Sequence, residues 1–155
     1  MYQRILVPVD GSHTSTLGLQ EAIRLAIDQR AKLRIVHVID ELVVAQNFDG
    51  YFANTSDLLD ALRDAGKKAL QNAQALASKH DLKAEATLFE SLGGRISEVI
   101  VKEAKKWRAD LIVMGTHGRR GVTRMVLGSD AEAILRVTPV PVLLVRAPDR
   151  KRRRG

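Results

Sequence analysis

Short apolar runs alternate with longer segments of helical period along most of the chain. The apolar runs predict strands at Ile5–Val9, Leu33–Ile39, Ala84–Phe89, Asp110–Met114 and Val140–Val145. The segments between them predict helices over about His13–Arg30, Asp57–His80, Ile96–Trp107 and Ser129–Val137. This alternation is typical of a parallel sheet that helices cover on both faces. We therefore expect an open α/β fold with five strands and four helices.

Two of the predicted helices carry a clear apolar face. Since only 4% of the residues are aromatic, aliphatic side chains must build the core. The first helix offers Leu19, Ala22, Ile23 and Ala26. The second, despite an interior Gly66, offers a stripe at the spacing of a buried helical face: Leu58, Leu62, Ala65, Ala69, Ala73 and Leu76.

The length of 155 residues suits one domain, which we place at residues 1–147. The absence of cysteine excludes disulfides, thiolate zinc sites and thiol nucleophiles. No apolar run approaches the length of a membrane span and no secretion signal is recognisable, so a cytoplasmic protein without membrane partners is expected.

The net charge of +7 is concentrated at the carboxyl end. Residues 148–155 hold five Lys and Arg side chains against Asp149, a net +4 that leaves +3 for the domain. Such a tail is either a disordered, solvated end or a contact for an acidic partner or RNA, so nucleic-acid binding elsewhere on the chain is not expected.

Polar and glycine residues follow three of the predicted strands. Ligands of open α/β sheets bind beyond the carboxyl ends of the strands. Asp10, Ile39 and Gly115 lie at or just past such ends and are candidates for one crevice. The irregular segment Asp40–Thr55 is longer than an ordinary connection and is predicted to form a flap over it.

A glycine-rich loop follows the fourth predicted strand, from Gly115 to Ser129. Glycines let backbone N–H groups converge on phosphate oxygens, and the next helix adds free N–H donors at its start. Arg119, Arg120 and Arg124 add positive charge. The alternative is an ordinary turn, with Ser129–Glu132 as a helix capping box.

Neither of the two common phosphate-binding patterns occurs in the chain. The sequence lacks both the P-loop pattern G-x-x-x-x-G-K-[ST] and the dinucleotide pattern G-x-G-x-x-G. The spacing Gly115-x2-Gly118-x9-Gly128-Ser129 instead matches the G-2x-G-9x-G-[ST] motif of the universal stress protein family. The chain resembles that family from about Met1 to Arg146, including Arg4–Ser12, Ala109–Gly115 and Pro139–Val145.

The resemblance implies a Rossmann-like fold of the adenine nucleotide hydrolase type with strand order 3-2-1-4-5. It also implies that the site holds ATP, or AMP or ADP, with any Mg²⁺ bound through the phosphates. Pro8 and Val9 would lie by the adenine, Asp10 by the ribose, and Met114 beside either. The backbone of Val38 would face the base. Gly115, Gly118, Gly128 and Ser129 would carry the phosphates. Arg119 is a further candidate phosphate contact, and His117 in the same loop is a candidate binding residue.

Asp130 departs from the pattern of the family's nucleotide binders, which often have a small or apolar residue there. A carboxylate suits the amino end of a helix, but without an intervening cation it repels a terminal phosphate. The departure weakens the prediction of a triphosphate and leaves AMP or another adenine nucleotide open. For Asp10 and Arg119 the alternatives are a turn carboxylate and a solvated arginine.

Three functions fit the sequence. The first is a regulatory nucleotide-binding protein of the stress response. The second is a slow ATPase or phosphoryl-transfer enzyme, for which only His117, Asp10 and Asp130 offer chemistry, and His117 suits a loop side chain in solvent or on backbone better than a catalyst. The third is a nucleotide-free interaction protein that acts through its basic tail.

The last predicted strand indicates self-association. Pro139 and Pro141 suit a strand start or a sheet edge, where ladder donors are not required. The apolar strand that follows these prolines would be exposed at the sheet edge unless another segment packs on it. That segment is either the basic carboxyl-terminal tail or the same strand of a second copy. The family resemblance implies a homodimer through Val140–Val145.

Overall fold

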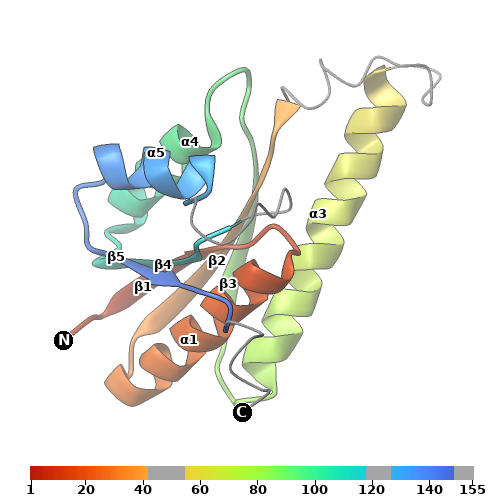
Figure 1. The fold of residues 1–155 in the computed structure, drawn as a ribbon. Helices are drawn as coiled ribbons and strands as arrows, with labels where there is room; N and C mark the ends of the chain where they lie inside the picture. Colours follow the sequence, from red (N-terminus) through yellow and green to blue (C-terminus); the bar gives the residue numbers. More distant parts are fainter. Residues whose placement is uncertain (42–54, 118–126, 149–155) are drawn as a thin grey trace, which may run out of the picture.

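A single parallel sheet forms the centre of the computed structural model, which describes residues 1–41, 55–117 and 127–148. Its strands are β1 (Arg4–Pro8), β2 (Lys32–Ile39), β3 (Ala84–Glu90), β4 (Leu111–Gly115) and β5 (Val142–Val145). They lie in the order β3-β2-β1-β4-β5, and each neighbouring pair is parallel. The predicted fold class and strand order are therefore confirmed (Figure 1).

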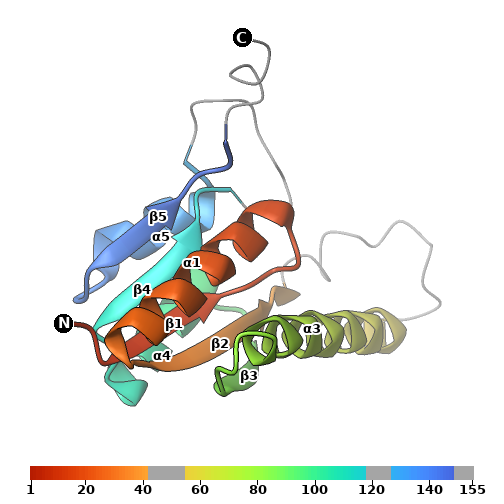
Figure 2. The ribbon, with the colours of Figure 1, turned by 90° about the horizontal axis from the view of Figure 1, so that it is seen from below.

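Helices cover both faces of this sheet. Helices α1 (His13–Gln29) and α3 (Thr55–Ser78) pack on one face, and α4 (Ile96–Trp107) and α5 (Ser129–Val137) on the other (Figures 1 and 2). The strands contribute side chains to the hydrophobic core on both faces of the sheet, because successive side chains of a strand point to opposite faces. Ile5 and Val7 join the core under α1 and α3, and Leu6 joins the core under α4 and α5. All three are completely buried.

The predicted apolar face of α1 is confirmed, but that of α3 is partly wrong. Leu58 and Ala73 are buried as expected, whereas Ala65 is exposed. The residue that faces the sheet in that turn is Gly66, where a Cβ atom would lie 2.8 Å from Cδ2 of His37. A glycine contributes no hydrophobic signal, so the spacing of apolar residues placed the buried position of this turn at Ala65, one residue too early.

Strand β5 begins at Val142, two residues later than predicted. Pro141 has no N–H to donate, and the N–H of Val140 donates to the hydroxyl of Thr138 at 3.2 Å. Residues 138–140 therefore form a bend before the ladder starts. The placement of this strand at an edge of the sheet, which the prolines predicted, is confirmed.

Helix α1 approaches β4 unusually closely. A Cβ atom on Gly18 would lie 3.0 Å from the backbone nitrogen of Gly115, and one on Gly115 would lie 2.7 Å from the carbonyl oxygen of Thr14. Two glycines thus allow the backbones to touch where β4 ends. This contact sets the position of the first turns of α1 beside the strand ends.

A charged cluster lies between α4 and the sheet, with Arg34 of β2 at its centre. Nη1 of Arg34 donates to Oε1 of Glu103 at 2.5 Å, and both side chains are largely buried. The guanidinium also stacks over the ring of Trp107, 4.7 Å from its centroid, and hydrogen-bonds to the more exposed Glu85. These interactions satisfy a cation that is otherwise costly to bury.

A second ion pair joins α3 to the end of β3. Nε of Arg63 donates to Oε1 of Glu90 at 2.5 Å. This hydrogen bond, together with the positive charge, lowers the pKa of the Glu90 carboxyl below its usual value, despite the opposing effect of burial. The pair ties the helix to the edge strand near the carboxyl end of the sheet.

Two predicted segments lie outside the described residues, namely the flap, which falls mostly on residues 42–54, and the basic tail at residues 149–155. Of the helices that the structure describes, none has the length and apolar character needed to cross a membrane.

Candidate functional site

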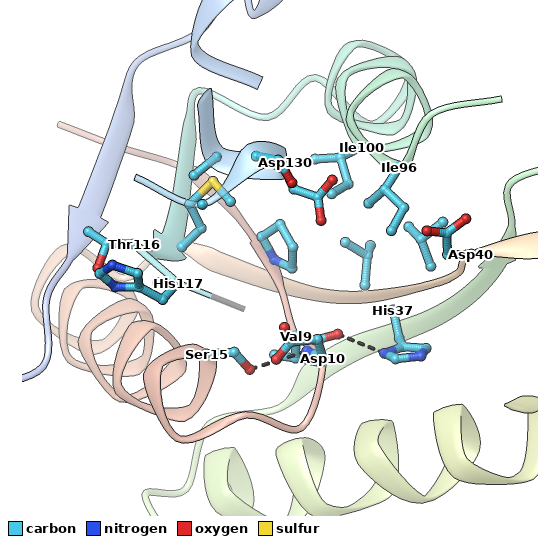
Figure 3. A pocket seen from close by; sticks show the side chains of 18 of the residues that line it. Val9, Asp10, Ser15, His37, Asp40, Ile96, Ile100, Thr116, His117 and Asp130 are labelled. Atoms are coloured by element: carbon cyan, nitrogen blue, oxygen red, sulfur yellow. Dashed lines mark hydrogen bonds between the residues drawn. The ribbon is translucent and has the colours of Figure 1, made fainter. Parts of the chain in front are cut away.

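A cavity of about 590 Å³ opens at the carboxyl ends of β1, β2 and β4. Asp10, Ile39 and Gly115, which follow or end these three strands, all line it. The predicted convergence of the strand ends on one crevice is therefore confirmed. Figure 3 shows the side chains of the surrounding elements directed into this space.

The turn after β1 presents Asp10 to the cavity. Oδ1 of Asp10 accepts from the N–H of Ser12 at 2.8 Å. The N–H of Asp10 donates to Oγ of Ser15 at 3.2 Å, as Figure 3 shows. Gly11 has a φ of +81°, which a residue with a side chain rarely adopts. Oδ1 of Asp10 thus stabilises the turn, which is the role that the alternative interpretation of Asp10 as a turn carboxylate expects. The residue also lines the cavity.

Apolar side chains line one part of the cavity. Val38 comes from β2, Met114 from β4, and Ile96 and Ile100 from α4. Sequence reasoning identified the first two but missed the isoleucines. Their spacing of four residues places them on one face of a helix. This spacing is the same for residues that line a cavity and for residues that pack in the core, so the sequence could not distinguish the two. This part of the site suits a flat, apolar ligand group.

The start of α5 forms another part of the wall. The N–H of Gly128 donates to the carbonyl of Thr116 at 2.8 Å, which holds the helix start against the end of β4. Gly128 is the N-cap and no side chain makes a capping hydrogen bond, so the alternative interpretation of Ser129–Glu132 as a capping box is wrong. The first intrahelical donor is Glu132, which leaves the N–H groups of residues 129–131 outside the helical ladder.

Carboxylates dominate the charge of the described wall. Asp10, Asp40, Asp130 and Glu132 line the cavity, and no lysine or arginine does so among the described residues. Figure 3 shows Asp130 and Asp10 on opposite sides of the space. Two of the four, Asp130 and Glu132, lie in the first turn of α5, where the helix dipole stabilises negative charge.

The ring of His117 is held at the end of β4 rather than in solvent. Nδ1 lies 2.8 Å from Oγ1 of Thr116, and Nε2 is shielded from solvent with no hydrogen-bond partner in the described part of the chain. His117 also lines the cavity. The expectation of a solvent-facing or backbone-bonded loop histidine is therefore wrong, because a neighbouring hydroxyl supplies the partner.

The structure brings ten of the twelve predicted site residues to one cavity, whereas Gly118 and Arg119 lie outside the described residues. The ten are Pro8, Val9, Asp10, Val38, Met114, Gly115, His117, Gly128, Ser129 and Asp130. Their contact with a ligand stays a prediction. Within residues 1–41, 55–117 and 127–148, no group of three or more metal-ligating side chains gathers.

Comparison with known proteins gives one consistent family. Residues 1–146 match the model of the universal stress protein family. Universal stress protein MJ0531 of Methanocaldococcus jannaschii is 33% identical over 152 residues, which cover 97% of this chain and 86% of that protein.

Solved structures agree with this match. A universal stress protein from Burkholderia pseudomallei superimposes with a TM-score of 0.73 at 32% identity, over 94% of this chain and 97% of that one. A universal stress protein in complex with cAMP superimposes with a TM-score of 0.67 at 27% identity, over 93% of this chain and 97% of that one.

Proposed function

The chain belongs to the universal stress protein family, and on this premise we propose that it binds an adenine nucleotide in the cavity at the ends of β1, β2 and β4. The observation that carries the proposal is the division of this cavity into an apolar part and a part walled by the start of α5. The relative in complex with cAMP supports the same class of ligand.

In this proposal the apolar part receives the adenine ring. Met114, Ile96 and Ile100 provide apolar surface, and the backbone of Val38 faces the edge of the ring. Asp10, which lines the cavity, accepts hydrogen bonds from the ribose hydroxyls through its carboxylate. Pro8 and Val9 complete the wall beside the base.

The phosphates would lie against the amino end of α5. Backbone N–H groups at the start of a helix bind anions directly, aided by the helix dipole. Ser129 adds a hydroxyl there, and Gly118 and Arg119 remain predicted contacts from the loop. Because the described residues hold no cluster of metal ligands, Mg²⁺ would be bound chiefly through the phosphates.

Asp130 is expected to disfavour the third phosphate. Replacing it by asparagine removes one negative charge from the cavity wall, so ATP affinity should rise about fivefold relative to AMP affinity when Mg²⁺ is chelated. Calorimetric titration of both nucleotides measures this ratio. Asp28→Asn, at an exposed position near the carboxyl end of α1 and outside the cavity wall, is the charge-matched control and should leave the ratio unchanged. An unchanged ratio in Asp130→Asn contradicts the role given to Asp130.

The ligand itself tests the proposed function. Freshly purified protein is denatured, the released small molecules are identified by mass spectrometry, and the emptied protein is then titrated with AMP, ATP and GTP. An adenine nucleotide in the extract, or preferential binding of AMP or ATP over GTP, supports the proposal. A tightly held ligand without an adenine ring contradicts it. Release of phosphate from ATP during the titration would move the assignment to a slow ATPase.

We further propose that the protein acts in the cytoplasm as a regulatory dimer in which nucleotide occupancy changes partner choice. Strand β5 is an edge of the sheet, and its Leu143 is 36% exposed. Leu135 and Val137 of α5 are also exposed. An unpaired apolar edge is stabilised by pairing with the same strand of a second copy.

Leu143→Lys should shift the protein from dimer to monomer, since it places a charge on the proposed contact. Sedimentation equilibrium measures the change, which we expect to exceed tenfold in the dimer dissociation constant. Ile27→Lys, at a comparably exposed leucine-sized position on α1, is the matched control and should remain dimeric. A wild-type protein that sediments as a monomer contradicts the proposed dimer.

A further inference from the structure

His37 is a buried side chain of the cavity wall to which the proposed function gives no role. It comes from β2, is 7% exposed and lines the cavity beside Val38. Its Nδ1 lies 2.7 Å from the carbonyl oxygen of Val9 (Figure 3). Because a carbonyl oxygen only accepts, Nδ1 must carry the proton and donate it to this bond.

This hydrogen bond lies where the ladder between β1 and β2 stops. The last register pair is Pro8 with Val36, and the N–H of Val9 still donates to the carbonyl of Val36 at 2.8 Å. In a regular parallel ladder the next bond would run from the N–H of Val38 to the carbonyl of Val9. That bond is absent from these described strands, and the ring of His37 donates to the Val9 carbonyl in its place.

The backbone of Val38 consequently faces the cavity. Successive residues of a strand direct their N–H and C=O groups to alternate neighbours. The carbonyl of Ile39 accepts from Ser91 on the β3 side at 3.1 Å. Val38, one residue earlier, therefore directs its N–H to the β1 side, where β1 has ended and the cavity begins.

Helix α3 fixes the ring of His37 in this position. A Cβ atom on Gly66 would lie 2.8 Å from Cδ2 and 3.1 Å from Nε2 of the ring. The helix backbone thus lies directly against the imidazole and limits its rotation. Gly66 is needed here because any larger residue would displace the ring from the Val9 carbonyl.

We propose that His37 is a positioning residue, which holds the Val9 carbonyl and thereby leaves the N–H of Val38 open to an acceptor nitrogen of a purine base. The proposal rests on the proposed function, in which the base lies in the apolar part of the cavity. His37 acts through Val9 and Val38 and needs no contact with the ligand. This role explains why a histidine in β2 packs against a glycine of α3 next to the cavity.

Amide hydrogen exchange of the ligand-free wild type tests the first half of this proposal without any nucleotide. The Val38 amide should exchange at least tenfold faster than the Val36 amide, which belongs to the ladder. Addition of AMP should slow Val38 and leave Val36 unchanged. Equal protection of the two amides in the ligand-free protein would overturn the proposal.

A shape-matched pair of variants tests the second half. His37→Leu removes the donor, whereas His37→Asn retains an amide N–H at the position of Nδ1. We expect AMP affinity to fall about tenfold in the leucine variant and to stay within about threefold of wild type in the asparagine variant. Affinity for ribose 5-phosphate, which has no base, should not change in either variant.

The outcomes separate the two proposals. If the wild-type protein binds no adenine nucleotide, the proposed function is wrong. The exchange rate of the Val38 amide in the ligand-free protein still shows whether this N–H is left without a partner in the ladder. Wild-type binding with equal affinities in the leucine and asparagine variants defeats the role of His37 alone. Should the leucine variant fail to fold, Gly66→Ala replaces it. Its methyl group would lie 2.8 Å from Cδ2 of His37 and 2.8 Å from Cδ1 of Leu88, and displacement of the ring should again weaken AMP binding and spare ribose 5-phosphate.

Discussion

Replacing Gly115 by alanine is expected to lower the free energy of unfolding by about 3 kcal/mol and to weaken AMP binding at least tenfold. The new Cβ atom would lie 2.7 Å from the oxygen and 2.8 Å from the carbon of the Thr14 carbonyl. Backbone atoms of α1 cannot rotate away, so β4 and α1 must separate. The shift would carry Thr116, which anchors Gly128 and the start of α5.

Urea denaturation and calorimetric titration measure the two effects. Gly93→Ala is the matched control, since Gly93 lies in an exposed turn with a φ of +79° and no atom within 4 Å of an added Cβ. It should cost about 1 kcal/mol through backbone strain and leave AMP binding unchanged. A Gly115→Ala variant as stable as the Gly93→Ala variant would contradict the close packing of α1 on β4.

Removing the buried carboxylate of Glu103 is expected to destabilise the protein by about 2–3 kcal/mol. In Glu103→Ala the Arg34 guanidinium keeps only its contact with the more exposed Glu85 and its stacking on Trp107. A partly buried cation without its main partner pays an uncompensated cost of desolvation. Thermal denaturation should show a fall of about 5–10 °C in Tm for a chain of this length.

Glu85→Ala provides the control within the same cluster. Its side chain is 52% exposed, and exposed ion pairs contribute less than about 1 kcal/mol. Since none of these residues lines the cavity, AMP affinity should be unchanged in both variants. Equal destabilisation by the two substitutions would show that burial of Glu103 does not determine the strength of the cluster.

The elements of this fold could be predicted because their apolar patterns follow directly from burial. Ile5, Leu6 and Val7 form a continuous apolar run since β1 is covered on both faces. The order of the strands could not be derived from those patterns and came from the family resemblance. Boundaries shifted where a local hydrogen bond decided them, as at Thr138 before β5.

Glycines were harder to interpret. Gly115 was predicted as a phosphate contact because it opens a glycine-rich loop, yet its approach to Thr14 requires a glycine there independently of any ligand. Gly66 carried no functional signal, although it lies against His37. In both cases the reason for the glycine is a neighbour that is distant in sequence, which a linear pattern does not reveal.

The candidate site was predicted where residues follow strand ends and missed where they lie inside regular elements. Asp10 and Gly115 stand at positions that the topology of open sheets marks as binding positions. Ile96 and Ile100 have the same spacing as core residues of α4, and His37 lies within a strand. Only the three-dimensional arrangement brings them to the cavity.

Equilibrium dialysis of labelled AMP against the purified protein tests the central claim most directly. We predict saturable binding of one AMP per chain with a dissociation constant in about the micromolar range, displaced by ATP and not by GTP. Absence of saturable binding up to about 1 mM AMP or ATP, with or without Mg²⁺, would contradict the claim that this cavity is an adenine nucleotide site.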